Sequence, residues 1–144
     1  MTPTGNVDDV GLLLDEAAYR LRCARKYDPL DDPRVLCENA HDAIEFSLNA
    51  VIIATGMPYR RTHDLAHLAD TAASAGHTLP PALAVVKALP RYTGGGRYEF
   101  RTTGAREPVS KAEYDHAVEL AEDILQWARE QVRDGMSPEQ EQGG

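Results

Sequence analysis

The stretch that decides the fold is AIEFSLNAVIIATG, residues 43–56. Its apolar residues recur at helical spacing, and the pattern reaches back far enough to predict a helix over residues 34–55. The apolar arc of this helix is wide, which is typical of a central helix that packs on several sides. Its inward positions are Leu36, Ala40, Ala43, Ile44, Ser47, Leu48, Val51 and Ile52. Gly56 is a natural end for this helix.

Helical spacing recurs on both sides of this segment. Residues 7–27 carry one apolar stripe, and two prolines in residues 27–33 then interrupt the chain. Further helices are predicted over residues 62–75, from Pro80-Pro81 onward, and from a capping box at residues 110–113 up to Val132. Strand signals are scarce. The sequence therefore predicts an all-α fold, an antiparallel up-down bundle of four to five helices.

Length and composition indicate one globular unit. The chain has 144 residues, of which 42% are hydrophobic, and we expect one domain over residues 1–134 and a disordered polar tail over 135–144. No apolar run is long enough to span a bilayer, and the N-terminus lacks the plan of a signal peptide. Two cysteines are too few for a disulfide framework. We therefore expect a cytoplasmic protein with reduced thiols.

Charge is unevenly distributed along the chain. The net charge is −8, which argues against a general nucleic-acid coat. Residues 1–56 and 108–144 carry net charges of −5 and −6, whereas residues 57–107 carry +3. The basic side chains of this middle third are Arg60, Arg61, Lys87, Arg91, Arg97, Arg101 and Arg106. It is the region in which we would look for an anion site, although an imbalance on a solvated surface explains the count equally well.

The segment RRTHDLAHLAD, residues 60–70, permits several interpretations. His63 and His67 share the spacing of a zinc-binding helix, but no third ligand follows a known pattern, so we predict no metal and no cofactor. The plainer interpretation is a helix start that Thr62 caps, with Asp64 in the first turn. Beside such a helix N-terminus, Arg60, Arg61 and His63 are candidate ligand-binding residues for a phosphate.

Two further groups of polar or aromatic residues are candidates for function. Arg91, Tyr92, Arg97 and Tyr98 could form a second wall of the ligand site, although tyrosines in this segment could equally fill the core. On the 34–55 helix, His41, Glu45 and Asn49 form a narrow polar strip. We favour a hydrogen-bonding role across the bundle, or a role at a dimer interface, over chemistry for this strip.

Three stretches together resemble a known family. They are AIEFSLNAVIIATG (43–56), RRTHDLAHLAD (60–70) and LPRYTGGGRYEF (89–100), and they occur in the order of the HEPN domain, the "higher eukaryotes and prokaryotes nucleotide-binding" helical bundle. The resemblance implies a helical homodimer. It also implies a noncatalytic module that responds to a nucleotide or RNA, within a toxin–antitoxin or defence cassette that has a nucleotidyltransferase-like partner.

The same resemblance implies an alternative, a metal-independent endoribonuclease toxin. Many members resemble one another in an Arg-x4-6-His motif in which the arginine holds the scissile phosphate and the histidine transfers a proton. Here the spacing matches Arg61 with His67, and Arg34 with His41, and neither pair lies at the start of the last helix, where the family has its motif. We therefore favour the noncatalytic function. A ligand-free scaffold or interaction protein is a third hypothesis.

Overall fold

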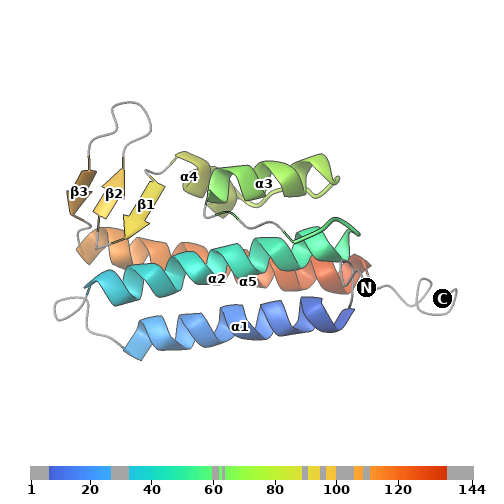
Figure 1. The fold of residues 1–144 in the computed structure, drawn as a ribbon, viewed down its shortest axis with the longest axis horizontal. Coiled ribbons are helices and arrows are strands. Elements are labelled where there is room, and N and C mark those ends of the chain that lie inside the picture. Colours follow the sequence, from blue (N-terminus) through green and yellow to red (C-terminus); the bar gives the residue numbers. More distant parts are fainter. Residues whose placement is uncertain are drawn as a thin grey trace, which may run out of the picture.

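The computed structural model describes residues 7–26, 33–59, 62, 64–88, 91–94, 97–99, 106–108 and 111–135. These residues form five helices and three short strands (Figure 1). The helices are α1 (Val7–Lys26), α2 (Pro33–Ala54), α3 (Leu65–Ser74), α4 (Pro81–Ala88) and α5 (Lys111–Gly135). The predicted all-α bundle of four to five helices is confirmed.

Helix α2 lies at the centre of the bundle. It packs against α1, α3 and α5, and α1 and α5 run in opposite directions beside it while α3 and α4 lie on the other side (Figure 1). The wide apolar arc explains this position, because Ala43, Ile44, Leu48, Val51 and Ile52 are all buried. Ala50 and Ile53 lie outside the predicted arc and are also buried, in a small cluster with Val10 of α1. Helix α2 is therefore enclosed more completely than its sequence pattern predicts.

The inward faces of the other helices agree with the helical spacing. The predicted inward residues that are buried are Val10, Ala17, Leu21 and Ala24 in α1, Leu65, Leu68, Ala69 and Ala72 in α3, and Ala117, Leu120, Ala121, Ile124 and Ala128 in α5. Leu14 and Val132 are half-buried and pack against the cluster that Val10 belongs to. Ser110 of the predicted capping box, and the predicted tail beyond Gly135, lie outside the described residues.

A small antiparallel sheet precedes the last helix, where no strand was predicted. Its strands are β1 (Arg91–Gly94), β2 (Arg97–Glu99) and β3 (Arg106–Pro108), in the order β1-β2-β3. Tyr92 pairs with Tyr98 across the first hairpin. Strands of three or four residues are too short for an alternating pattern to show in the sequence, and their formation depends on the pairing between them.

The connection between α3 and α4 is fastened to α5 by Trp127. Its indole Nε1–H donates to the backbone carbonyl of Thr78 at 3.0 Å, and its ring meets the His77 ring edge to face, with centroids 6.3 Å apart. Trp127 is only 8% exposed. Because an indole N–H buried without a partner is costly, this bond fixes the linker on the helix.

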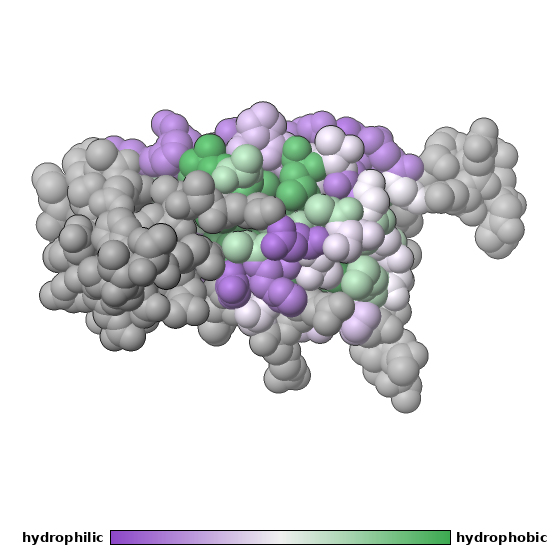
Figure 2. Space-filling model, turned by 90° about the horizontal axis from the view of Figure 1, so that it is seen from above, coloured by the Kyte–Doolittle hydropathy of each residue, from purple (hydrophilic) through white to green (hydrophobic). Residues whose placement is uncertain are grey.

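One face of the molecule carries both hydrophobic and hydrophilic residues. Seen from above, green hydrophobic residues occupy a limited area bordered by purple hydrophilic ones (Figure 2). Leu12, Tyr19, Tyr59 and Val85 are the large hydrophobic side chains exposed among the described residues. In the same part of the chain, no helix combines the length and apolar character needed to cross a membrane.

Candidate functional site

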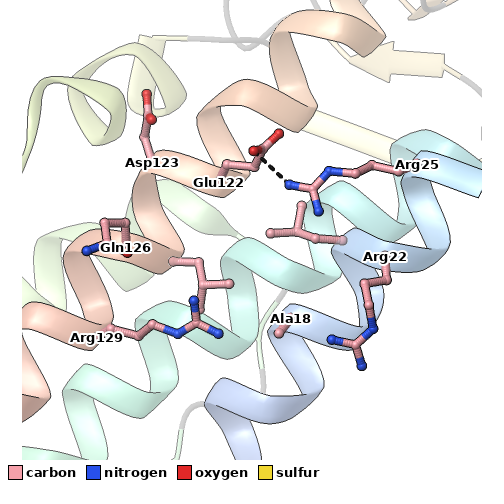
Figure 3. A pocket seen from close by; sticks show the side chains of 9 residues that line it. Ala18, Arg22, Arg25, Glu122, Asp123, Gln126 and Arg129 are labelled. Atoms are coloured by element: carbon pink, nitrogen blue, oxygen red, sulfur yellow. Dashed lines mark ion pairs between the residues drawn. The ribbon is translucent and has the colours of Figure 1, made fainter.

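A groove runs between α1 and α5, with a volume of about 550 Å³ (Figure 3). It forms because both helices pack mainly on α2 and only weakly on each other. Its apolar lining comes from Ala18, Leu21 and Leu125. The remaining lining side chains are charged or polar: Arg22, Arg25, Glu122, Asp123, Gln126 and Arg129. The groove is therefore suited to a polar ligand.

Helical spacing puts the polar residues of each groove wall on one side of their helix. Arg22 and Arg25 are three residues apart on α1, and Gln126 and Arg129 are three apart on α5, so each pair shares one side of its helix. In Figure 3 the side chain of Arg25 reaches toward α5, and that of Arg129 reaches toward α1. Guanidinium groups from two helices thus enter one groove.

One of the three arginines is engaged by a carboxylate of the described residues. Arg25 Nη2 lies 2.7 Å from Glu122 Oε2, and the two side chains are 50% and 43% exposed. Arg22 and Arg129 form no ion pair within the described part of the chain, and the Arg22 guanidinium lies 5.8 Å from the centroid of the Tyr19 ring. Asp123 points away from Arg25 and Arg129 (Figure 3). The groove therefore has two cationic groups available to an anion.

Tyr19 lies on α1 beside Arg22, one of the groove residues. A hydrogen bond with Cys23 is the main cause that raises the pKa of the Tyr19 phenol above its usual value, with the charge of Cys23 next in importance. The phenol therefore stays neutral at physiological pH. Cys23 itself is half-buried and is a free cysteine.

The groove was not predicted from the sequence. The charge distribution favours an anion site in the basic middle third, whereas the groove takes its arginines from the first and last thirds, which are acidic overall. The sequence contains one local indication of the groove, because Arg22 and Arg25 lie on one side of a predicted helix in the first third of the chain. Nothing in the linear sequence brings Arg129 next to them.

The start of α3 differs from its predicted form. Asp64, not Thr62, is the N-cap residue, and its carboxylate accepts hydrogen bonds from the backbone N–H groups of Ala66 and His67 at 3.1 and 3.2 Å. The Thr62 hydroxyl accepts instead from the Asp64 N–H at 3.1 Å. A carboxylate already occupies the helix N-terminus, so two of the N–H groups proposed for a phosphate are satisfied from within the chain.

The predicted residues around this helix start are described only in part. His67 is exposed on α3, whereas Arg60, Arg61 and His63 lie outside the described residues. The pairing of Arg61 with His67 therefore stays a prediction, as does the ligand-binding role of Arg60, Arg61 and His63. Among the described residues, no group of three or more His, Cys, Asp or Glu side chains is arranged to hold a metal ion.

The second predicted wall falls on the small sheet. Arg91 and Tyr92 lie in β1, and Arg97 and Tyr98 lie in β2. The backbone pairing puts Tyr92 opposite Tyr98, whereas Arg91 is opposite Glu99. The hairpin thus brings the two tyrosines of the prediction together along the backbone, and the ligand-binding role of all four residues stays a prediction.

The polar strip of α2 points into the bundle. Asn49 is fully buried and Glu45 is 8% exposed, and the Asn49 amide donates to the Glu45 carbonyl at 3.3 Å. His41 is half-buried. A dimer interface through this strip stays a prediction. The hydrogen bond from Asn49 to Glu45 lies within α2, so hydrogen bonding of this strip across the bundle also stays a prediction.

Comparison with known proteins identifies the family. No curated protein and no solved structure matches the chain. The family model described as the HEPN domain matches residues 10–131, a span that runs from the first turn of α1 into the last turns of α5. It includes the α1–α5 groove, the start of α3 and the small sheet. The chain therefore belongs to the HEPN domain family.

Proposed function

We propose that this protein is a noncatalytic HEPN module that binds a nucleotide or a nucleic acid in the α1–α5 groove and responds to it. The observation that carries the proposal is the meeting of Arg22, Arg25 and Arg129 in one groove. With Glu122 and Asp123 in the same lining, three positive and two negative side chains leave a net charge of +1 there, in a chain of net charge −8. Such a local reversal of sign favours an anionic ligand.

Arginine is well suited to this role. Its planar guanidinium presents paired N–H donors that match two phosphate oxygens, and it stays charged at every physiological pH. Gln126 adds an amide that can both donate and accept a hydrogen bond beside the arginines. Together these groups can bind a phosphate and a neighbouring polar edge of a ligand.

The residues of the groove support a noncatalytic function. RNA cleavage without a metal needs a group that transfers protons near neutral pH, and histidine is the usual choice. Among the described residues, the groove lining contains arginine, carboxylate, amide and apolar side chains but no histidine. Binding in this groove would therefore serve recognition. We propose further, from the family resemblance, that the module is a homodimer. It would belong to a toxin–antitoxin or defence cassette with a nucleotidyltransferase-like partner.

A thermal-shift panel tests the binding proposal. The full chain is heated with AMP, ADP, ATP and a short RNA, and at least one ligand raises the melting temperature of the wild type through mass action. Arg22→Ala combined with Arg129→Ala abolishes the shift. Arg133→Ala is the matched control, because Arg133 is an exposed arginine of α5 outside the groove lining. Absence of a shift with every ligand would leave the ligand-free scaffold.

Arg60→Ala combined with Arg61→Ala belongs in the same panel. If this pair abolishes the shift while the groove variants retain it, the ligand binds at the start of α3 and not between α1 and α5. If the groove variants abolish it and the Arg60 and Arg61 pair retains it, the groove is the site. The panel therefore assigns the ligand to one of the two arginine groups.

The endoribonuclease remains a second candidate, because the exposed ring of His67 on α3 is accessible to an RNA substrate. This alternative predicts that the pure protein cuts RNA in the presence of EDTA. His67→Ala and Arg61→Ala would each abolish the cutting, and His116→Ala, an exposed histidine of α5, would not. Intact RNA after incubation with the wild type excludes this candidate.

A further inference from the structure

We propose that two copies of this chain pair through the outward side of α1, with the two α1 helices antiparallel about a two-fold axis. The inference rests on the homodimer of the proposed function and adds to it the surface and the relative orientation of the copies. Three features of α1 carry it: two exposed hydrophobic side chains, exposed charges at the same helical spacing, and a division of charge along the helix.

The outward side of α1 carries two large hydrophobic side chains. Helix α1 packs on α2 and α5 and lies at the lower edge of the molecule in Figure 1. Leu12 is 66% exposed and Tyr19 is 50% exposed. They are seven residues apart, so they lie on the same side of the helix, two turns from each other. A single exposed hydrophobic residue needs no partner, whereas two aligned on one side form a seam that a second helix can cover.

Exposed charged residues continue this seam. Asp15, Arg22 and Lys26 are exposed and form no ion pair within the described part of the chain. Together with Leu12 and Tyr19 they recur at intervals of three and four residues, which is the spacing of the contact seam between two paired helices. Exposed residues at this spacing thus run along α1 from Leu12 to its last residue.

The charges of α1 are divided between its two halves. Residues 7–16 contain four acidic side chains and no basic one, whereas residues 17–26 contain four basic side chains and no acidic one. Acids at the start of a helix and bases at its end suit the helix dipole, but this effect fades within the first and last turns. Asp15 and Arg22 lie between those turns, so the dipole alone does not explain the division.

This division fits a second copy of the chain in one orientation. A two-fold axis brings the same surface of both copies together. If the two α1 helices were parallel, acids would face acids and bases would face bases, and like charges repel. In the antiparallel orientation the acidic half of each copy faces the basic half of the other. The outward side of α1 is therefore complementary to itself.

Sedimentation equilibrium of the full chain tests the inference. Over a range of micromolar concentrations we expect the wild type to reach twice the mass of one chain, and high salt to weaken the pairing because it screens exposed charges. Leu12→Lys raises the dimer Kd by at least about tenfold, since it removes an apolar contact and puts a positive charge against the basic half of the second copy. Val85→Lys is the matched control, because Val85 is an exposed hydrophobic residue of α4, and it leaves the dimer Kd unchanged.

An exchange of charge tests the antiparallel orientation. Asp15→Arg and Arg22→Asp each raise the dimer Kd by about fivefold, because each puts like charges between the facing halves and does so twice in a two-fold dimer. The two replacements combined restore opposite charges, and the Kd returns to within about threefold of the wild type. Circular dichroism checks that every variant keeps its helix content.

The outcomes separate this inference from the function on which it rests. A dimer that Leu12→Lys does not weaken overturns the inference alone, because the copies then pair through another surface. A combined variant that stays as weak as the single ones overturns the antiparallel orientation and the inference with it. A wild type that stays monomeric overturns both the inference and the proposed homodimer, while ligand binding in the groove is measured separately by the thermal shift.

Discussion

The Nδ1 atom of His77 lies 2.8 Å from Oε1 of Gln131, which joins the α3–α4 connection to the last helix. The other ring nitrogen of His77 lies 2.7 Å from the hydroxyl of Thr55, at the end of α2. One imidazole thus links three segments that are far apart in the sequence. It does so beside the Trp127 ring, so polar and apolar contacts fasten the same linker.

We predict that His77→Ala lowers the free energy of unfolding by about 1–2 kcal/mol, since two net hydrogen bonds are lost and their partners can reach water. His67→Ala is the control, because His67 is an exposed histidine of α3 and its replacement should change stability by less than about 0.5 kcal/mol. Urea denaturation measures both variants. If His77→Ala changes the free energy of unfolding as little as His67→Ala does, the His77 contacts contribute nothing to stability.

Replacement of Asp64 tests the cap of α3. Asp64→Ala should cost about 1 kcal/mol, because Ala66 and His67 lose their acceptor, whereas Asp64→Asn should retain most of the stability because asparagine also caps. Thr62→Ala should cost less than Asp64→Ala. Hydrogen exchange of the first backbone amides of α3 measures the loss of the cap at the helix start itself. A larger loss from Thr62→Ala would restore threonine as the principal cap.

Trp127 offers a direct probe of the linker contact. Trp127→Phe keeps an aromatic ring in the core but removes the N–H that bonds Thr78, and we expect a loss of about 1 kcal/mol. Trp127→Ala should cost about 3–5 kcal/mol because it also leaves a cavity. Trp127 is the single tryptophan of the chain, so unfolding of these two variants is measured by circular dichroism. Tryptophan fluorescence can report the unfolding of the variants that keep Trp127. If Trp127→Phe and Trp127→Ala lower the free energy of unfolding by similar amounts, the hydrogen bond and the packing of the ring do not make separate contributions.

The central position of α2 predicts a large difference between two leucines. Leu48 is fully buried in the main core cluster, so Leu48→Ala should lower the free energy of unfolding by about 2–5 kcal/mol. Leu12 is 66% exposed on α1, and Leu12→Ala should change it by less than about 0.5 kcal/mol. Chemical denaturation of both variants compares them. A small effect at Leu48 would place α2 outside the core.

The sequence by itself determined the helices and their inward faces. Apolar residues three and four positions apart share one side of a helix whatever surrounds it, so Leu21, Leu48, Leu68 and Ile124 could be assigned to the core in advance. The three stretches that resemble the HEPN domain also stand in the family's order along the sequence. These features depend on neighbours along the chain, which the sequence contains directly.

Only the tertiary structure decided which helices meet and what lies between them. The groove exists because α1 and α5 share α2 as a neighbour, and this packing brings Arg129 of α5 into one groove with Arg22 and Arg25 of α1. The contact of His77 with Gln131 and the pairing of the short strands have the same origin. At the start of α3, Thr62 and Asp64 were both able to cap, and the backbone conformation selected Asp64. Local spacing fixes the side of a helix on which a residue lies, whereas its partner across space depends on how the whole chain packs.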